Sequence, residues 1–117
     1  MEQWLFKVER EFDRLDVIVA NVGCTSNVGK VCDIPDEDWH RVLGVNTTGT
    51  WYSLKFGVPL IQKGGRGGAV IIISSAAGFR AAAVEEVHGH SPGGHYSVSK
   101  AAINSLSKKK FKNMSLV

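Results

Sequence analysis

Apolar residues recur at helical spacing near the start of the chain and then give way to a short continuous apolar stretch. The helically spaced positions are Leu5, Val8, Phe12 and Leu15. Charged residues lie between them, which predicts an amphipathic helix with one buried side. The stretch LDVIVAN that follows is apolar and rich in β-branched residues. This composition is typical of a buried strand in a parallel sheet.

A long helical pattern leads to a second apolar stretch. Residues 24–34 have no periodicity and predict a loop, after which Pro35 and three acidic residues mark a helix start. The helix face predicted to be buried comprises Trp39, Val42, Leu43, Asn46 and Thr50. Internal glycines and Pro59 indicate a bend or close packing. The segment QKGGRGG then predicts a turn and AVIIISS a strand. Two apolar strands joined through a helix predict a βαβ unit with parallel strands.

The last third of the chain combines a long loop with one more helix. Residues 76–94 are small, polar and rich in glycine and histidine, so we expect a lid or binding loop. A helix is predicted from Tyr96 to about Lys112. The residues whose spacing suits a buried face of this helix are Val98, Ala101, Ala102, Ser105 and Leu106. The pattern as a whole predicts one α/β domain.

Composition and charge narrow the classes of function. With 117 residues and a 44% hydrophobic fraction, the chain has room for one globular domain. The net charge of +3 comes largely from the basic run Lys108, Lys109, Lys110 and Lys112. No aromatic stacking platform accompanies this run, so a solvated helix end is favoured and no nucleic-acid partner is expected. No apolar run reaches membrane-spanning length and the charged start has no signal-peptide core, so we expect a cytoplasmic protein without a membrane partner.

Several reactive residue types have simpler interpretations. Cys24 and Cys32 lack metal-ligand spacing and are expected to be reduced thiols. Four residues could form a metal site, but their position in a glycine-rich loop argues against one: Glu85, His88, His90 and His95. No metal is therefore predicted. The GGRGG segment lacks the Lys-Ser/Thr of a phosphate loop, which favours a turn.

Polar side chains follow both predicted strands. Asn21 closes the first strand and Ser75 the second, where parallel α/β sheets bind their ligands. Tyr96 precedes Lys100 by four positions, so the ammonium can lie beside the phenol and favour its ionised form. Together with the Asn46 carboxamide, these groups could converge on one acid–base site. Taken singly, the tyrosine and lysine could belong to an ordinary surface helix, Ser75 could be a cap and Asn46 a surface amide.

Four segments in this order resemble the short-chain dehydrogenase/reductase family. They are ANVG after a strand, DEDWHRVLGVNTTG, IIISSAAG and YSVSK. The resemblance implies a partial Rossmann-like doubly wound parallel sheet. It also implies interconversion of an alcohol and a ketone with NAD or NADP, and assembly into a homo-oligomer. The small-molecule partner would be that alcohol or ketone.

The resemblance assigns roles residue by residue. Tyr96 matches the catalytic acid/base, and Lys100 matches the lysine that tunes it and holds the cofactor ribose. Ser75 matches the serine that binds the substrate oxygen, with Ser74 as the weaker candidate. Asn46 matches the asparagine that anchors a water for proton relay. Two further positions match the cofactor-binding segment after the strand: Asn21 and Gly23.

The sequence departs from the family in two places. The family's Gly-x-x-x-Gly-x-Gly cofactor fingerprint is absent, so residues 1–117 are expected to form one partial NAD(P)-binding domain that keeps the active-site portion. The interval from Ser75 to Tyr96 is also longer than usual, around residues 85–92. A similar glycine-rich extension, a VIVAN strand end and a GGRGG-like turn occur in relatives resembling carveol dehydrogenase and the mycofactocin-linked oxidoreductases.

The alternative is a non-catalytic fragment that keeps only the family's helix-mediated subunit surface. The aromatic residues that would form it are Trp39, Trp51, Tyr52 and Phe56.

Overall fold

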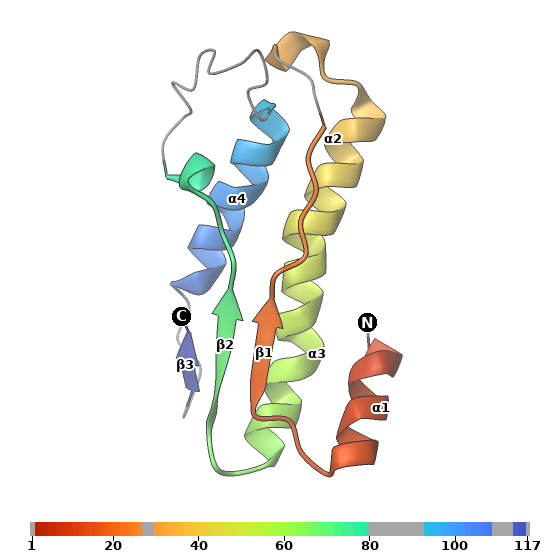
Figure 1. Cartoon of the computed structure of the whole chain (residues 1–117), viewed down its shortest axis with the longest axis vertical. Coiled ribbons are helices and arrows are strands. Elements are labelled where there is room, and N and C mark those ends of the chain that lie inside the picture. Colours follow the sequence, from red (N-terminus) through yellow and green to blue (C-terminus); the bar gives the residue numbers. More distant parts are fainter. Residues whose placement is uncertain (1, 27–29, 80–92, 109–113, 117) are drawn as a thin grey trace.

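A computed structural model describes residues 2–26, 30–79, 93–108 and 114–116. Its strands β1 (Val17–Ala20), β2 (Gly68–Ile72) and β3 (Met114–Leu116) form a parallel sheet in the order β1-β2-β3. The α-helices are α1 (Glu2–Phe12), α2 (Asp36–Leu43), α3 (Gly49–Lys63) and α4 (Gly94–Ser107). Two short 3-10 helices are η1 (Val31–Asp33) and η3 (Ala76–Gly78), and the π-helical segment η2 (Gly44–Thr48) lies between α2 and α3. Figure 1 shows α3 running alongside β1, whereas α4 lies beside the segment that follows β2.

The predicted βαβ unit is confirmed. In β1 and β2, Ile18 pairs with Val70 and Ala20 with Ile72, in parallel register. The turn between α3 and β2 contains two glycines with positive φ, Gly65 and Gly67, a conformation that favours glycine. The predicted turn is therefore confirmed at QKGGRGG.

The predicted long helix runs continuously through α2, η2 and α3, with a π-helical segment at its centre. This π-helical segment is η2, Gly44–Thr48, which contains Asn46. Close packing also accounts for one of the glycines, because a Cβ at Gly57 would overlap the Ile18 side chain. Three of the residues predicted on the inner face, Val42, Asn46 and Thr50, are buried, whereas Trp39 and Leu43 are half-buried.

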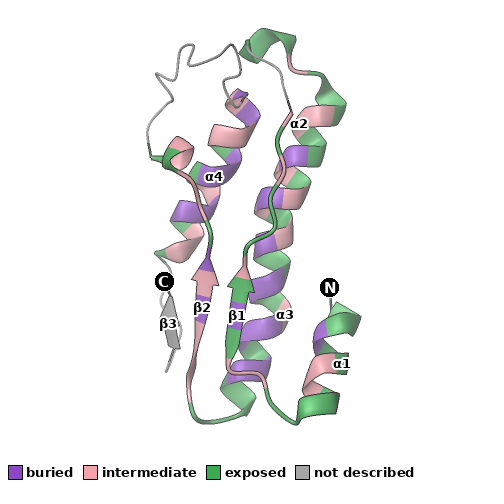
Figure 2. Ribbon diagram, viewed as in Figure 1, coloured by how far each residue is buried: buried purple, intermediate pink, exposed green. Residues whose placement is uncertain are grey.

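The core lies on one face of the sheet. Its buried residues are Ile18, Leu54, Val58, Ile61, Val70, Ile72 and Ile103, contributed by two strands, α3 and α4. On the opposite face, Val17 and Val19 are 51% and 56% exposed. Figure 2 shows the buried stripe of α3 facing the sheet while most of β1 is coloured as exposed. The prediction of a strand buried on both faces is wrong for β1, because no described helix covers its second face.

Two predicted helix faces need correction. In α1, Leu5 is buried, but Phe12 is exposed and Leu15 lies beyond the helix end. In α4, the predicted stripe is not the buried one: Val98, Ala101 and Ser105 are exposed, while Ala102 and Leu106 are half-buried. The buried residues of α4 are His95, Ser99, Lys100, Ile103 and Asn104. Apolar periodicity missed this face because most of its members are polar and hydrogen-bonded.

The C-terminal part also differs from expectation. The helix predicted to reach about Lys112 ends at Ser107, and the chain then returns as β3, which the sequence did not predict. Most of the long loop predicted over residues 76–94, including residues 85–92, lies outside the described residues. Within the described ranges, none of the helices combines the length and apolarity needed to cross a bilayer.

Candidate active site

A cleft of about 630 Å³ opens where the carboxyl ends of β1 and β2 meet the start of α4. It is lined by Asn21, Gly23, Cys24, Thr25, Ile73, Ser74, Ser75, Tyr96 and Lys100. The structure thus brings together five of the six predicted site residues. Asn46 does not line the cleft.

Lys100 supplies a buried cation to this cleft. The side chain is 4% exposed, and its Nζ donates a hydrogen bond of 2.9 Å to the carbonyl oxygen of Ile73. The same nitrogen lies 5.7 Å from the centre of the Tyr96 ring. None of the ion pairs in the described part of the chain involves Lys100. Because an ammonium group has three donors, this one retains capacity for further acceptors.

Gly23 keeps the space beside this ammonium open. A Cβ at this position would lie 3.3 Å from Lys100 Nζ and 3.4 Å from Asn46 Oδ1. The first distance is tighter than ordinary contacts of a Cβ, and the second is at the lower limit of ordinary van der Waals contact. A side chain here would therefore press on Lys100 and narrow the cleft, so glycine is favoured by close approach.

The side chain of Asn46 is hydrogen-bonded to the loop that follows β1. Its Oδ1 accepts from the Cys24 amide at 2.8 Å, and its Nδ2 donates to the Cys24 carbonyl at 2.9 Å. The Nδ2 also donates to Ser99 Oγ at 2.9 Å, and Ser99 Oγ donates in turn to the Tyr96 carbonyl. The Asn46 amide therefore pairs with the loop backbone as a neighbouring strand would, and joins that loop to α4.

The two serines after β2 differ in their contacts. Ser75 Oγ accepts a hydrogen bond of 3.2 Å from the Ala77 amide and so caps η3. Ser74 Oγ lies 3.4 Å from the Lys100 carbonyl and donates to it. The hydroxyl hydrogen of Ser75 is not used by this cap, so Ser75 can also donate towards the cleft.

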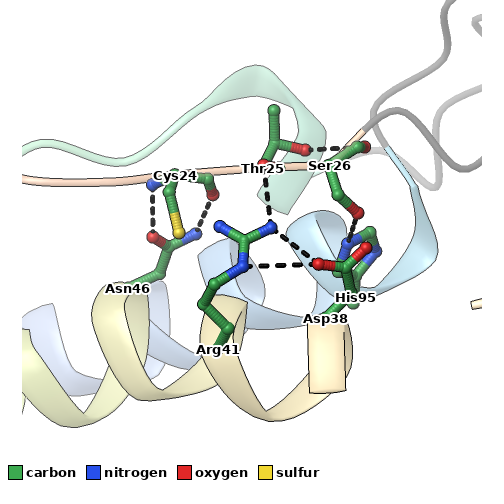
Figure 3. Close-up of polar contacts among 7 residues, drawn as sticks. All are labelled: Cys24, Thr25, Ser26, Asp38, Arg41, Asn46 and His95. Atoms are coloured by element: carbon green, nitrogen blue, oxygen red, sulfur yellow. Dashed lines mark hydrogen bonds and ion pairs between the residues drawn. The ribbon is translucent and has the colours of Figure 1, made fainter. Parts of the chain in front are cut away.

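A second set of polar contacts borders the cleft. Ser26 Oγ lies 2.7 Å from Nε2 of His95, while Arg41 pairs with Asp38 at 2.8 Å and donates to the Thr25 carbonyl at 3.5 Å. These contacts appear in Figure 3, together with the Asn46–Cys24 pair. The hydrogen bond from Arg41 is the main reason that the pKa of Asp38 lies below its ordinary value.

The sequence did not single out these positioning contacts. Ser99 lies within YSVSK, where its place next to Lys100 was the available signal, but Ser26 and the Cys24 backbone carry no motif. For His95, the sequence suggests only the role of a metal ligand. Within the described ranges, no cluster of three or more histidine, cysteine or acidic residues could hold a metal, and Glu85, His88 and His90 lie outside those ranges.

Comparison with known proteins shows to which family the chain belongs. The family model described as Enoyl-(Acyl carrier protein) reductase matches residues 1–111. An uncharacterised NAD-dependent oxidoreductase of Mycobacterium tuberculosis is 41% identical over 97 residues, and the (-)-trans-carveol dehydrogenase of Rhodococcus erythropolis is 38% identical over 93. The chain belongs to the short-chain dehydrogenase/reductase family, as its four motifs predicted.

Solved structures agree with this placement. Carveol dehydrogenase from Mycobacterium avium in complex with NAD matches 92% of this chain with a TM-score of 0.80 and 32% identity. A short-chain dehydrogenase from Mycobacterium paratuberculosis bound to NAD matches 90% with a TM-score of 0.74 and 38% identity.

The matches cover only part of each relative. The chain spans 32% of the M. tuberculosis protein and 31% of the R. erythropolis enzyme, although 82% and 80% of the chain itself are matched. In the two NAD complexes, the matched part is 36% and 37% of the solved chain. The partial Rossmann-like fold predicted from the sequence is confirmed at this level.

Proposed function

We propose that this chain carries the acid–base portion of an oxidoreductase that interconverts an alcohol and a ketone with NAD(H) or NADP(H). The observation that carries the proposal is the meeting of Ser75, Tyr96 and Lys100 in one cleft at the ends of β1 and β2. NAD is favoured because relatives are named NAD-dependent and two of the similar structures hold NAD.

The residues in the cleft fit the sugar end of such a dinucleotide. Lys100 presents an ammonium that is buried, bonded to one carbonyl and unpaired by any described carboxylate. Gly23 leaves the space beside it open, and Asn21 lines the same wall. A hydroxyl-bearing ligand can therefore reach Lys100 without displacing a side chain. The 117 residues contain no Gly-x-x-x-Gly-x-Gly phosphate loop, so we expect weak affinity of the chain alone.

The protein groups would divide the proton chemistry among them. When bound, the nicotinamide ring supplies the acceptor for the hydride that leaves the alcohol carbon. Tyr96 takes the hydroxyl proton during oxidation and returns it during reduction, which requires a group of matched acidity within hydrogen-bond reach. Ser75 donates to the substrate oxygen, and Lys100, whose Nζ lies 5.7 Å from the centre of the Tyr96 ring, is the proposed charged partner of that phenol. Asn46 fixes the loop that forms one wall of the cleft, and its further proposed role is to anchor a water molecule for proton relay.

Two measurements on the intact chain test this function. Titration with NADH followed by nucleotide fluorescence gives the affinity, and oxidation of a cyclic secondary alcohol such as carveol gives turnover. Tyr96→Phe is expected to lower turnover by about 100-fold or more with little change in NADH affinity, because proton transfer alone is lost. Lys100→Ala should impair both. A Tyr96→Phe variant with most of its turnover, or a wild-type chain without NADH binding, would overturn the proposal.

A second function is favoured by an aromatic surface on α3. Trp51 and Tyr52 are 42% and 38% exposed, their ring centroids lie 4.8 Å apart, and Tyr52 stacks on Phe56 at 5.7 Å. Lys55 Nζ lies within 4.9 Å of the Trp51 ring centroid. Exposed aromatic area of this kind is typical of interfaces, so a non-catalytic chain could still bind another subunit. Association that persists without nucleotide and is lost in Trp51→Ser would favour this second function.

A further inference from the structure

His95 is a buried polar side chain to which the proposed chemistry gives no task. It is fully buried in the first turn of α4, immediately before Tyr96. Its Nδ1 has no hydrogen-bond partner among the described residues. An apolar side chain would fill the same volume without leaving a polar atom unpaired, so packing alone does not account for the imidazole.

The polar contact of His95 reaches across the site. Its Nε2 lies 2.7 Å from Ser26 Oγ, which belongs to the loop of residues 21–26 that follows β1. Four residues of this loop line the cleft: Asn21, Gly23, Cys24 and Thr25. Figure 3 shows the Ser26–His95 contact beside the Asn46–Cys24 pair and the Arg41–Asp38 pair. The loop therefore contacts α4 through Ser26 and is hydrogen-bonded to the π-helical segment η2 through Cys24, two residues earlier.

Side chains hold this loop at three points. Asn46 bonds both backbone groups of Cys24, Arg41 donates to the Thr25 carbonyl, and His95 contacts Ser26. Of these, His95 alone extends from the helix that carries Tyr96 and Lys100. A displacement of Ser26 relative to His95 would alter the distance between the two walls of the cleft.

We propose that His95 is a positioning residue, which through Ser26 sets the distance of the 21–26 loop from Tyr96 and Lys100 and thereby the affinity for the dinucleotide. The inference rests on the proposed function. It assigns His95 no contact with substrate or cofactor.

Four variants separate this role from space filling. His95→Leu and Ser26→Ala remove the contact, His95→Gln can restore a polar atom near the position of Nε2, and the double variant His95→Leu/Ser26→Ala tests their coupling. His40→Leu is the matched control, because His40 is exposed on α2. Each variant is titrated with NADH, and hydrogen exchange of the Cys24–Ser26 amides is followed by NMR without nucleotide.

We expect His95→Leu and Ser26→Ala each to weaken NADH binding about three- to tenfold, the range that one lost hydrogen bond produces. The double variant should be no weaker than either single variant, and His95→Gln should remain within about twofold of wild type. Exchange at Cys24–Ser26 should rise in His95→Leu and fall back in His95→Gln. The control should match wild type in both measurements.

Equal impairment of the Leu and Gln variants, multiplying effects in the double variant, or unchanged loop exchange in His95→Leu would overturn the role of His95. A wild-type chain that binds no NADH would instead overturn the proposed function. The loop-exchange measurement needs no nucleotide, so the two failures are distinguishable.

Discussion

The two faces of the sheet carry similar β-branched side chains in opposite surroundings. Ile18, Val70 and Ile72 lie on the face covered by α3 and α4 and are buried, whereas Val17 and Val19 on the other face are more than half exposed. An apolar groove of about 640 Å³ runs along the open edge of β1, and Trp4 and Val45 contribute to its lining. Residue type therefore predicts that both faces of the sheet need to be covered. Whether their side chains are buried depends on which elements pack against each face.

The polar contacts that hold the cleft also come from the covered side of the sheet. The loop of residues 21–26 is held by side chains of the helices on the covered side, Asn46, Arg41 and His95. Lys100 is likewise fixed to the end of β2 through Ile73. The covered side thus supplies both the core and the polar contacts that shape the cleft.

The largest expected effect comes from placing the same charge on each face. Val70→Asp buries a carboxylate in the core and should cost about 4 kcal/mol or more of unfolding free energy, which is most of the stability of a small domain. Val19→Asp should cost about 1 kcal/mol or less, because the side chain stays in water. Urea unfolding followed by circular dichroism measures both. Equal losses would show that the two faces are not distinct.

A smaller difference is expected between two glycines of the long helix. Gly57→Ala should cost about 1–3 kcal/mol, because its Cβ would overlap the Ile18 side chain on the covered face. Gly44→Ala is the matched control, since a Cβ there meets nothing within 4 Å, and it should stabilise the chain by up to about 1 kcal/mol. The same urea titrations compare the two. A neutral Gly57→Ala would mean that α3 and β1 pack less closely than described.

The uncovered face should affect mainly the molecular mass of the protein in solution. We expect the chain to self-associate, because Val17 and Val19 expose apolar area next to an open strand edge. The double variant Val17→Asp/Val19→Asp should shift the mass measured by light scattering towards the 12.7 kDa monomer while changing stability little. Thr48→Asp, exposed on the helical side, serves as the control. A monodisperse wild-type monomer would contradict this prediction.

The sequence predicts the parts of this molecule in which local pattern and packing agree. The βαβ unit follows from its apolar stretches, and Tyr96, Lys100 and Ser75 meet where strand ends and a helix start were expected to converge. The buried face of α4 was not predictable in this way, because Ser99, Lys100 and Asn104 are polar residues. They are buried with their side chains hydrogen-bonded to other parts of the chain. The Ser26–His95 contact joins positions 69 residues apart, and no local pattern encodes such a contact.

The smallest expected effect concerns the exposed ion pair at the end of the covered side. The Arg41 hydrogen bond holds the pKa of Asp38 below its ordinary value of 3.8. A carboxyl with a lowered pKa in the folded state adds stability above its unfolded-state pKa, and this contribution is lost as the pH falls through the lowered value. The stability difference between wild type and Asp38→Asn should thus be constant near neutrality and shrink below about pH 4.

Because the pair is exposed, the difference should be small and should also diminish with salt. Thermal unfolding at several pH values measures it, with Asp36→Asn on the same exposed turn as the control. A large loss of stability in Asp38→Asn at neutral pH would show that surface charge, and not the covered apolar face, contributes most to holding α2 in place.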